Sequence, residues 1–443
     1  MVRAVQPRTV RWLAAIVLIS LIGSSLAQRY FGHAMAVPDL DFYDYYFAAQ
    51  AVREHPRANL YEGATEGNPQ LKSAPKQSEI AAHARAEGFQ DTELYLYPPL
   101  LADLLAPVSW LPARLAAALW RGWNLALVLA AMALLAPLLR LRLLSAEFAI
   151  LAAAAYWFWP VHEAVSDGQV TILLLMLWAA AIAAYAGGRV ALSAVALALA
   201  TALKLTPAAI LPVFVLWKER RWLAAYLAAL AGLTALMAAV NGPENLRIYA
   251  AVIGAMGQGI PAIGNKSLTS MTAWLYYGRV FSLRTVHEAM QGSPLLPRLA
   301  AKAVSGAFFL GCLLPVWQAR RRMDRTARAN VLAIFALAIC CLAPVSWRHG
   351  YTVALIPLAI LWVRALRTPP HAMHLALLAL TTFTQGTLFF DLAAEAPLPG
   401  PARIVCASLW VVLSCWLCLD ALVAMRDPPG QTGSNFHFEK ARP

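Results

Sequence analysis

Residues 169–217 read QVTILLLMLWAAAIAAYAGGRVALSAVALALATALKLTPAAILPVFVLW, and this stretch decides the fold class. Its only charged residues are Arg189 and Lys204. About 20 apolar residues in a helix suffice to cross the hydrocarbon core of a bilayer, which is about 30 Å thick. Comparable apolar runs recur from Val10 to Met425. The chain is therefore predicted to be an all-α polytopic membrane protein.

The composition of the 443-residue chain agrees with this class. Hydrophobic residues make up 60% and charged residues 13% of the chain, against about 45–50% and about 25% in soluble domains. With a mean hydropathy of +0.58, an ordinary cytosolic enzyme, a disordered chain and a coiled coil are excluded. The net charge of +13 is attributed to basic cytoplasmic loops rather than to a nucleic-acid partner. All six cysteines lie in apolar runs, which argues against disulfides and a zinc site.

The apolar runs predict a bundle of about 12 transmembrane helices. The first runs from about Val10 to Leu26. Ser25-Leu26-Ala27 resembles a signal-peptidase site, so a cleaved signal peptide is an alternative, and either choice places the next segment outside. The later helices are expected at 97–111, 114–139, 145–160, 169–186, 190–217, 222–240, 300–318, 329–345, 351–366, 371–390 and 403–425.

Basic clusters set the predicted orientation, because cytoplasmic loops are rich in Lys and Arg. The clusters at 218–221, 320–328 and 364–367 are all cytoplasmic if both termini are inside. The loops 29–96 and 241–298 are then external. In this arrangement 140–142, with its two arginines, falls outside and violates the rule.

The sequence also predicts the domain boundaries and the structure of the segments outside the membrane. Residues 1–425 are expected to form one integral-membrane domain. Within its first external loop, 41–54 and 76–88 are predicted as amphipathic helices on the membrane surface. The tail 426–443 is predicted to be disordered and cytoplasmic.

Polar residues at the mouth of such a bundle are functional candidates, since ionisable groups in membrane segments are costly. Asp39, Asp41 and Asp44 lie among aromatic residues just after the first helix. A carboxylate here could act as a general base on a sugar hydroxyl, and Tyr45 could stack on a sugar. The alternative is an aromatic belt with solvated acids.

Five further groups carry polar side chains: Tyr97 before paired prolines, Asp167-Gly168-Gln169 after Glu163, Lys204 inside an apolar run, Asn265-Lys266, and Arg348-His349. Lys204 could bind a phosphate or form a structural ion pair. In the predicted topology the groups around Asp41, Tyr97, Asn265 and His349 share the external face. No nucleotide-binding or metal-binding motif is visible, so no cofactor and no metal are expected.

Taken in order, these pieces resemble the family 87 glycosyltransferases, which include polyprenol-phosphate-mannose-dependent mannosyltransferases. The matching pieces are DFYDYYFAA followed by LYEG, YPPLLADLLAPVSWLP, DGQVTILLL, ALKLTPAAILPVFVL, GNKSLTS and APVSWRHG. The resemblance implies the GT-C fold, a helix bundle whose external loops hold the active site, and it implies Asp41 as the catalytic base. The residues expected to bind substrates are Asp44, Tyr45, Tyr97, Gln169, Lys204, Asn265, Lys266, Arg348 and His349.

Two positions depart from the family pattern. Arg348-His349-Gly350 stands where many relatives have a His pair after Trp, and Lys266 stands where Gln is usual.

The implied protein is a multi-pass glycosyltransferase of a bacterial inner (plasma) membrane. It would move a hexose, with mannose as the expected sugar, from a polyprenyl-phosphate donor to a lipid or glycan acceptor at the periplasmic face. A transporter or flippase of a lipid-linked sugar is the alternative from another class. It predicts an internal repeat, and none stands out. A non-catalytic membrane scaffold is a third alternative, and it would leave unexplained why the polar groups gather on one face of the membrane.

Overall fold

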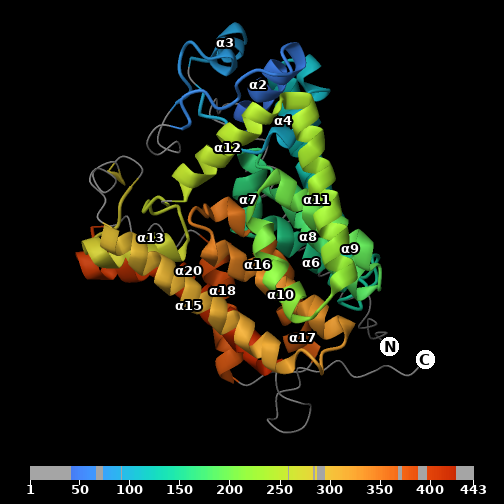
Figure 1. The fold of residues 1–443 in the computed structure, drawn as a ribbon. Coiled ribbons are helices and arrows are strands. Elements are labelled where there is room, and N and C mark those ends of the chain that lie inside the picture. The colour runs from blue at the N-terminus through green and yellow to red at the C-terminus, as the bar shows by residue number, and fades with distance from the viewer. Residues whose placement is uncertain are drawn as a thin grey trace, which may run out of the picture.

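The computed structural model of the chain consists of helices joined by turns and loops (Figure 1). It describes residues 41–65, 73–90, 92–257, 259–282, 285–286, 295–367, 372–387 and 397–425. The predicted first helix and the predicted disordered tail lie outside these residues. The helices are α2 (Asp41–Glu54), α3 (Glu79–Ala86), α4 (Pro99–Leu105), η2 (Val108–Trp110), α5 (Ala113–Leu135), α6 (Ala146–Trp157), α7 (Trp159–Ser166), α8 (Thr171–Ala186), α9 (Val190–Leu203), η3 (Thr206–Ile210), α10 (Leu211–Leu216), α11 (Arg220–Asn241), α12 (Pro243–Met256), α13 (Leu268–Tyr277), α15 (Leu295–Ala319), α16 (Arg325–Leu342), η4 (Arg348–Ala354), α17 (Leu355–Arg367), α18 (Ala372–Gly386) and α20 (Gly400–Ala424).

Several helices are long and apolar enough to cross a membrane. Among the described residues there are six: α5, α11, α15, α16, η4 continued by α17, and α20. The pair α6 and α7, bent by 61° at Phe158, makes a seventh. Only 11% of the apolar window of α11 is buried, against 72% for α16. Because an apolar surface left uncovered in this way suits lipid and not water, α11 lies at the periphery and α16 in the core. The chain is thus a multi-pass, all-helical membrane protein, and the count of about 12 spans remains a prediction.

The predicted helix 97–111 is wrong as a membrane span. Its residues form α4, whose seven residues are about 10 Å long, and the single turn η2. Pro107 lies between them and Pro112 follows, so the chain cannot continue as one helix. Instead, α4 packs against α2 at one end of the bundle (Figure 1).

The predicted single helix 190–217 is also wrong. α9 ends at Leu203, and Lys204 adopts an extended conformation before η3 and α10 turn back. Pro207 at the start of η3 removes a helix hydrogen bond and enforces the break. Gly188, before α9, lies against the Arg325 side chain, and Trp217, after α10, stacks on Tyr185 at the end of α8. Both ends of the segment therefore lie at the same end of the bundle, as in a re-entrant hairpin.

Together, these two corrections change the direction in which the helices between residues 97 and 217 cross the membrane. Losing one span at 97–111 reverses the direction of α5 to α8, and losing another at 190–217 restores the direction from α11 onwards. Arg140 thus joins the basic end of the bundle, where its carbonyl oxygen accepts a hydrogen bond from Arg367 Nη2 at 3.3 Å. Glu219 and Arg328 pair at that end too. All basic clusters then gather at one end of the bundle, including the two arginines that violated the positive-inside rule in the predicted topology.

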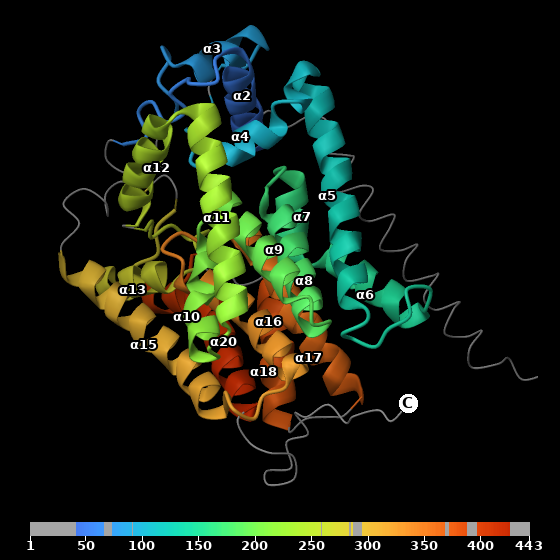
Figure 2. The same ribbon diagram turned by 45° about the vertical axis from the view of Figure 1, so that its right-hand side comes forward.

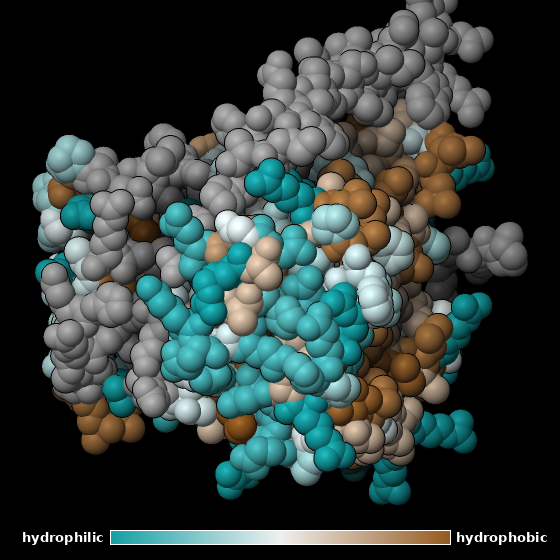
Figure 3. Space-filling model, turned by 90° about the horizontal axis from the view of Figure 1, so that it is seen from above, coloured by the Kyte–Doolittle hydropathy of each residue, from teal (hydrophilic) through white to brown (hydrophobic). Residues whose placement is uncertain are grey.

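The opposite end of the bundle carries α2, α3, α4 and α12 (Figures 1 and 2). Viewed from above, hydrophilic residues gather over the middle of this face and apolar residues at its rim (Figure 3). α2 has the predicted bounds, but it is not an amphipathic surface helix, because ten of its residues from Phe42 to Val52 are buried. Instead, α2 packs against α3, α4 and η2. The other predicted helix, 76–88, is the shorter α3, capped by the Ser78 hydroxyl.

The corrected topology makes a labelling prediction. Arg142→Cys and Arg221→Cys should react with a membrane-impermeant thiol reagent from the same side, and Glu244→Cys from the opposite side, since all three positions are exposed. The unsubstituted protein with its own cysteines supplies the background. The topology drawn from hydropathy alone pairs Arg142 with Glu244 instead, so labelling of those two from one side would refute the arrangement described here.

Candidate active site

The site is built where the start of α2 meets the turn between α7 and α8. The backbone N–H of Phe42 donates to the Asp167 carbonyl oxygen at 3.2 Å. Trp120 of α5 donates from Nε1 to the Gly168 carbonyl oxygen at 2.7 Å. Gly168 has a φ of +69°, which other residues rarely adopt. A side chain there would meet Phe42, since an added Cβ would lie 2.6 Å from the Phe42 Cβ.

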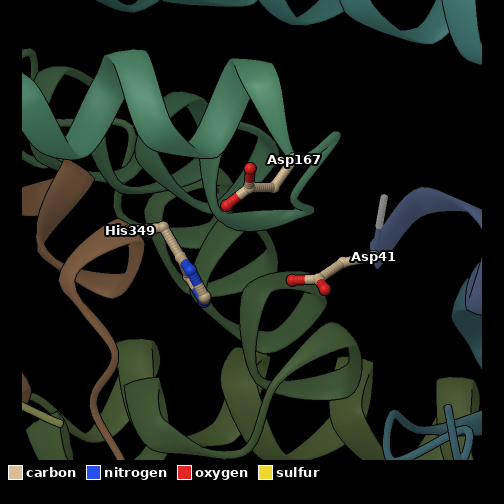
Figure 4. Close-up of side chains that lie close together, drawn as sticks. All are labelled: Asp41, Asp167 and His349. Carbon is tan, nitrogen blue, oxygen red and sulfur yellow. The ribbon is translucent and has the colours of Figure 1, made fainter. Parts of the chain in front are cut away.

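This junction brings three ionisable side chains together. The ligand-type atoms of Asp41, Asp167 and His349 all lie within 4.8 Å of one another. Asp41 begins α2, Asp167 ends α7, and His349 lies in η4. The three side chains point toward a common space (Figure 4).

The acids of this end raise one another's pKa values. Burial is the main cause of a pKa for Asp41 well above its usual range, and the neighbouring Asp44 and Asp167 add to it. Burial, with Glu163 nearby, raises the pKa of Asp167 to about 7, although Arg348 and Arg121 oppose this shift. Ionised carboxylates here therefore depend on nearby positive charge.

Positive charge comes from two predicted residues. Arg348 pairs with Glu163, its Nε and Nη2 lying 3.0 and 2.9 Å from Oε1. Lys204, at the break after α9, lines a cavity together with Thr171, Thr206 and Ser346. The Lys204 ammonium has no ion-pair partner among the described residues, although it interacts electrostatically with Asp41. The structure thus gives no support to the structural ion pair that the sequence left open.

Asp44 and the predicted aromatic residues form hydrogen bonds that connect the segments around the site. The Asp44 carboxylate accepts hydrogen bonds from the Thr92 hydroxyl at 2.9 Å and the Glu93 backbone N–H at 3.2 Å. The hydroxyls of Tyr45 and Tyr97 both donate to Gln169 Oε1, at 2.9 and 3.2 Å. These two hydrogen bonds to Gln169 connect α2 and the segment before α4 to the residues that lead into α8.

Asn265 and Lys266 do not lie in this cluster. The Asn265 amide is fully buried, donating to the carbonyls of Ile260 and Pro344 and accepting from the Ser346 N–H. Its hydrogen-bonding groups are engaged by the backbone, which argues against the predicted substrate contact and for positioning the loop that leads to His349. Lys266 is also fully buried, with Nζ over the rings of Trp274 at 6.0 Å and Trp410 at 5.7 Å.

Sequence reasoning counted Asp167 and Glu163 among the candidate polar groups but not among the expected site residues. Both were noted as polar, but the predicted topology placed them on the opposite face from Asp41. The signal that could have found them was the pair of arginines at 140–142, which violated the positive-inside rule only in that topology.

Comparison with known proteins identifies the family of the chain. The model of glycosyltransferase family 87 matches residues 95–344, more than half of the chain. The chain therefore belongs to glycosyltransferase family 87. The matched region includes Asp167 and Lys204, whereas Asp41 and His349 lie outside it.

One curated relative is also similar. It is the polyprenol-phosphate-mannose-dependent alpha-(1-2)-phosphatidylinositol pentamannoside mannosyltransferase of Mycobacterium tuberculosis (strain CDC 1551 / Oshkosh). The two are 28% identical over 272 residues, which cover 60% of this chain and 57% of the relative.

The contact between Gly168 and Phe42 supports a prediction on stability. Gly168→Ala should lower the free energy of unfolding by about 2–5 kcal/mol, because a left-handed alanine costs about 1–2 kcal/mol and a forced displacement of α2 about 1–3 kcal/mol. Gly278→Ala is the matched control, because its φ of +63° is similar and an added Cβ meets nothing within 4 Å. Thermal unfolding in detergent should show a clearly larger loss for position 168. Equal losses would mean that the contact with α2 contributes nothing.

Proposed function

We propose that this protein transfers a hexose, with mannose as the expected sugar, from a polyprenyl-phosphate donor to a lipid or glycan acceptor. The reaction would take place at the periplasmic face of a bacterial inner membrane. Membership of glycosyltransferase family 87 and the activity for which the mycobacterial relative is named support the donor class. The orientation is supported by the basic clusters, which all lie at the end opposite the site.

The observation that carries the proposal is the Asp41 carboxylate at the hydrophilic end of an apolar bundle. Within the described residues it has no hydrogen-bond partner of its own, and it faces Asp167 and His349. A carboxylate that no other group engages is available to accept a proton from an acceptor hydroxyl.

The chemistry follows from these groups. The acceptor oxygen forms a bond to C1 of the sugar as its proton passes to Asp41. The bond between C1 and the phosphate oxygen breaks, and its electron pair leaves with the polyprenyl phosphate. Lys204, in the cavity lined by Thr206 and Ser346, is placed to stabilise the developing phosphate charge.

Purified protein in detergent tests this directly. Polyprenyl-phosphate mannose labelled in the sugar should transfer its label to an acceptor lipid extract, and a nucleotide-linked mannose should not. Movement of intact donor across liposome membranes without transfer would instead support the flippase alternative.

A further inference from the structure

We infer that Asp41, Asp167 and His349 form a binding site for one divalent transition-metal cation. Their ligand-type atoms lie within 4.8 Å of one another, although the residues come from α2, the end of α7 and η4. The side chains converge on one space from three directions (Figure 4), as ligands around an ion do.

The His349 ring is an independent indication. It is 8% exposed, and among the described residues it has no hydrogen-bond partner. Figure 4 shows the ring beside the carboxylates of Asp41 and Asp167, with all three side chains bordering one space. An imidazole without a protein partner that borders two carboxylates suits a metal ligand.

The carboxylates of Asp41 and Asp167 differ from other acids at this end of the bundle in their hydrogen bonding. Asp44 accepts from Thr92 and Glu93, and Asp103 accepts from Asn241 at 2.8 and 3.1 Å. Neither Asp41 nor Asp167 has a side-chain hydrogen bond within the described part of the chain. Two half-buried carboxylates that lie close together without hydrogen-bond donors repel each other when ionised, and a cation between them removes this cost.

The ligand types indicate which ion is expected. One imidazole and two carboxylates suit Mn²⁺ or Zn²⁺ better than the all-oxygen sites of Ca²⁺ and Mg²⁺. A second acidic group, Asp41 with Asp44 and Glu93, has a similar spacing. It offers no imidazole, its Asp44 is already hydrogen-bonded, and Glu93 is exposed. The site that includes His349 is therefore the one assigned.

The role of the ion rests on the proposed function. A cation beside Asp41 would act with Lys204 on the charge of the departing phosphate, as a Lewis acid. Asp41 has two carboxylate oxygens, so binding an ion through one leaves the other for the acceptor proton.

Mn²⁺ binding to the full-length protein tests the inference without turnover. Protein purified in detergent is stripped with EDTA and titrated with Mn²⁺, and the free ion is followed by electron paramagnetic resonance. One saturable site per chain is expected. Asp167→Asn and His349→Gln should each raise the Kd at least about tenfold, since even outer-shell partners contribute about 10–100-fold. Asp103→Asn is the matched control and should bind like the unsubstituted protein. Gel filtration checks that each variant is folded.

The outcomes separate this inference from the proposed function. Saturable Mn²⁺ binding that the two ligand variants lose supports the site, even if no sugar is transferred. Absence of saturable binding overturns it, as does equal weakening by Asp103→Asn. Full sugar transfer by EDTA-stripped protein with no metal present would overturn the role of the ion as a Lewis acid, while the proposed function would stand.

Discussion

Asp41→Asn should abolish sugar transfer while leaving donor binding nearly unchanged. The substitution keeps the shape of the side chain at the start of α2 and removes the group that accepts the acceptor's proton. General-base contributions are about 10²–10⁴-fold, so turnover should fall by at least about 100-fold. Turnover with labelled polyprenyl-phosphate mannose and equilibrium binding of the same donor measure the two effects separately.

The control for this substitution is Asp103→Asn. Asp103 is a half-buried carboxylate at the same end of the bundle, hydrogen-bonded to the Asn241 amide, and it is not part of the Asp41 group. Its variant should retain most of the turnover. If Asp41→Asn retains near-normal turnover, Asp41 is not the base, and Asp44 becomes the candidate. Asp44 already accepts two hydrogen bonds, which makes it the weaker base of the two.

Much of the fold could be predicted because hydrophobic runs record which residues avoid water. The helices α5, α8, α11, α15, α16, α18 and α20 lie close to their predicted ranges, and α2 has its predicted bounds. What hydropathy does not record is the direction of the chain. Pro107 and Pro207 end apolar helices inside runs that look continuous, and each break changes the side on which the following helices begin.

The candidate site was predicted in part for the same reason. Asp41 and His349 were assigned to one face, and the structure brings them together. Asp167 was assigned to the other face, because the span wrongly predicted at 97–111 reversed its side. Asn265 shows a different limit, since residue type cannot distinguish an amide that meets a sugar from one that binds the backbone carbonyls of Ile260 and Pro344.

Lys204→Met should chiefly weaken donor binding. The ammonium lies at the break between α9 and η3, beside the hydroxyls of Thr206 and Ser346. It has no carboxylate partner within ion-pair distance among the described residues, so an anion from the donor is the partner expected for it. Hydrogen bonds that involve a charged group contribute about 1.5–3 kcal/mol, so the donor Kd should rise by about 10- to 100-fold.

Two further variants show what the charge does at this position. Lys204→Arg keeps the charge and should recover part of the affinity, whereas Lys302→Met removes an exposed lysine of α15 and should change nothing. The measurement is binding of polyprenyl-phosphate mannose to protein that elutes as a single folded species. A Lys204→Met protein that is poorly expressed but binds donor normally would assign Lys204 to folding. A weakened affinity that Lys204→Arg partly restores would place the donor phosphate at the break, because arginine restores the positive charge and the N–H donors that methionine lacks.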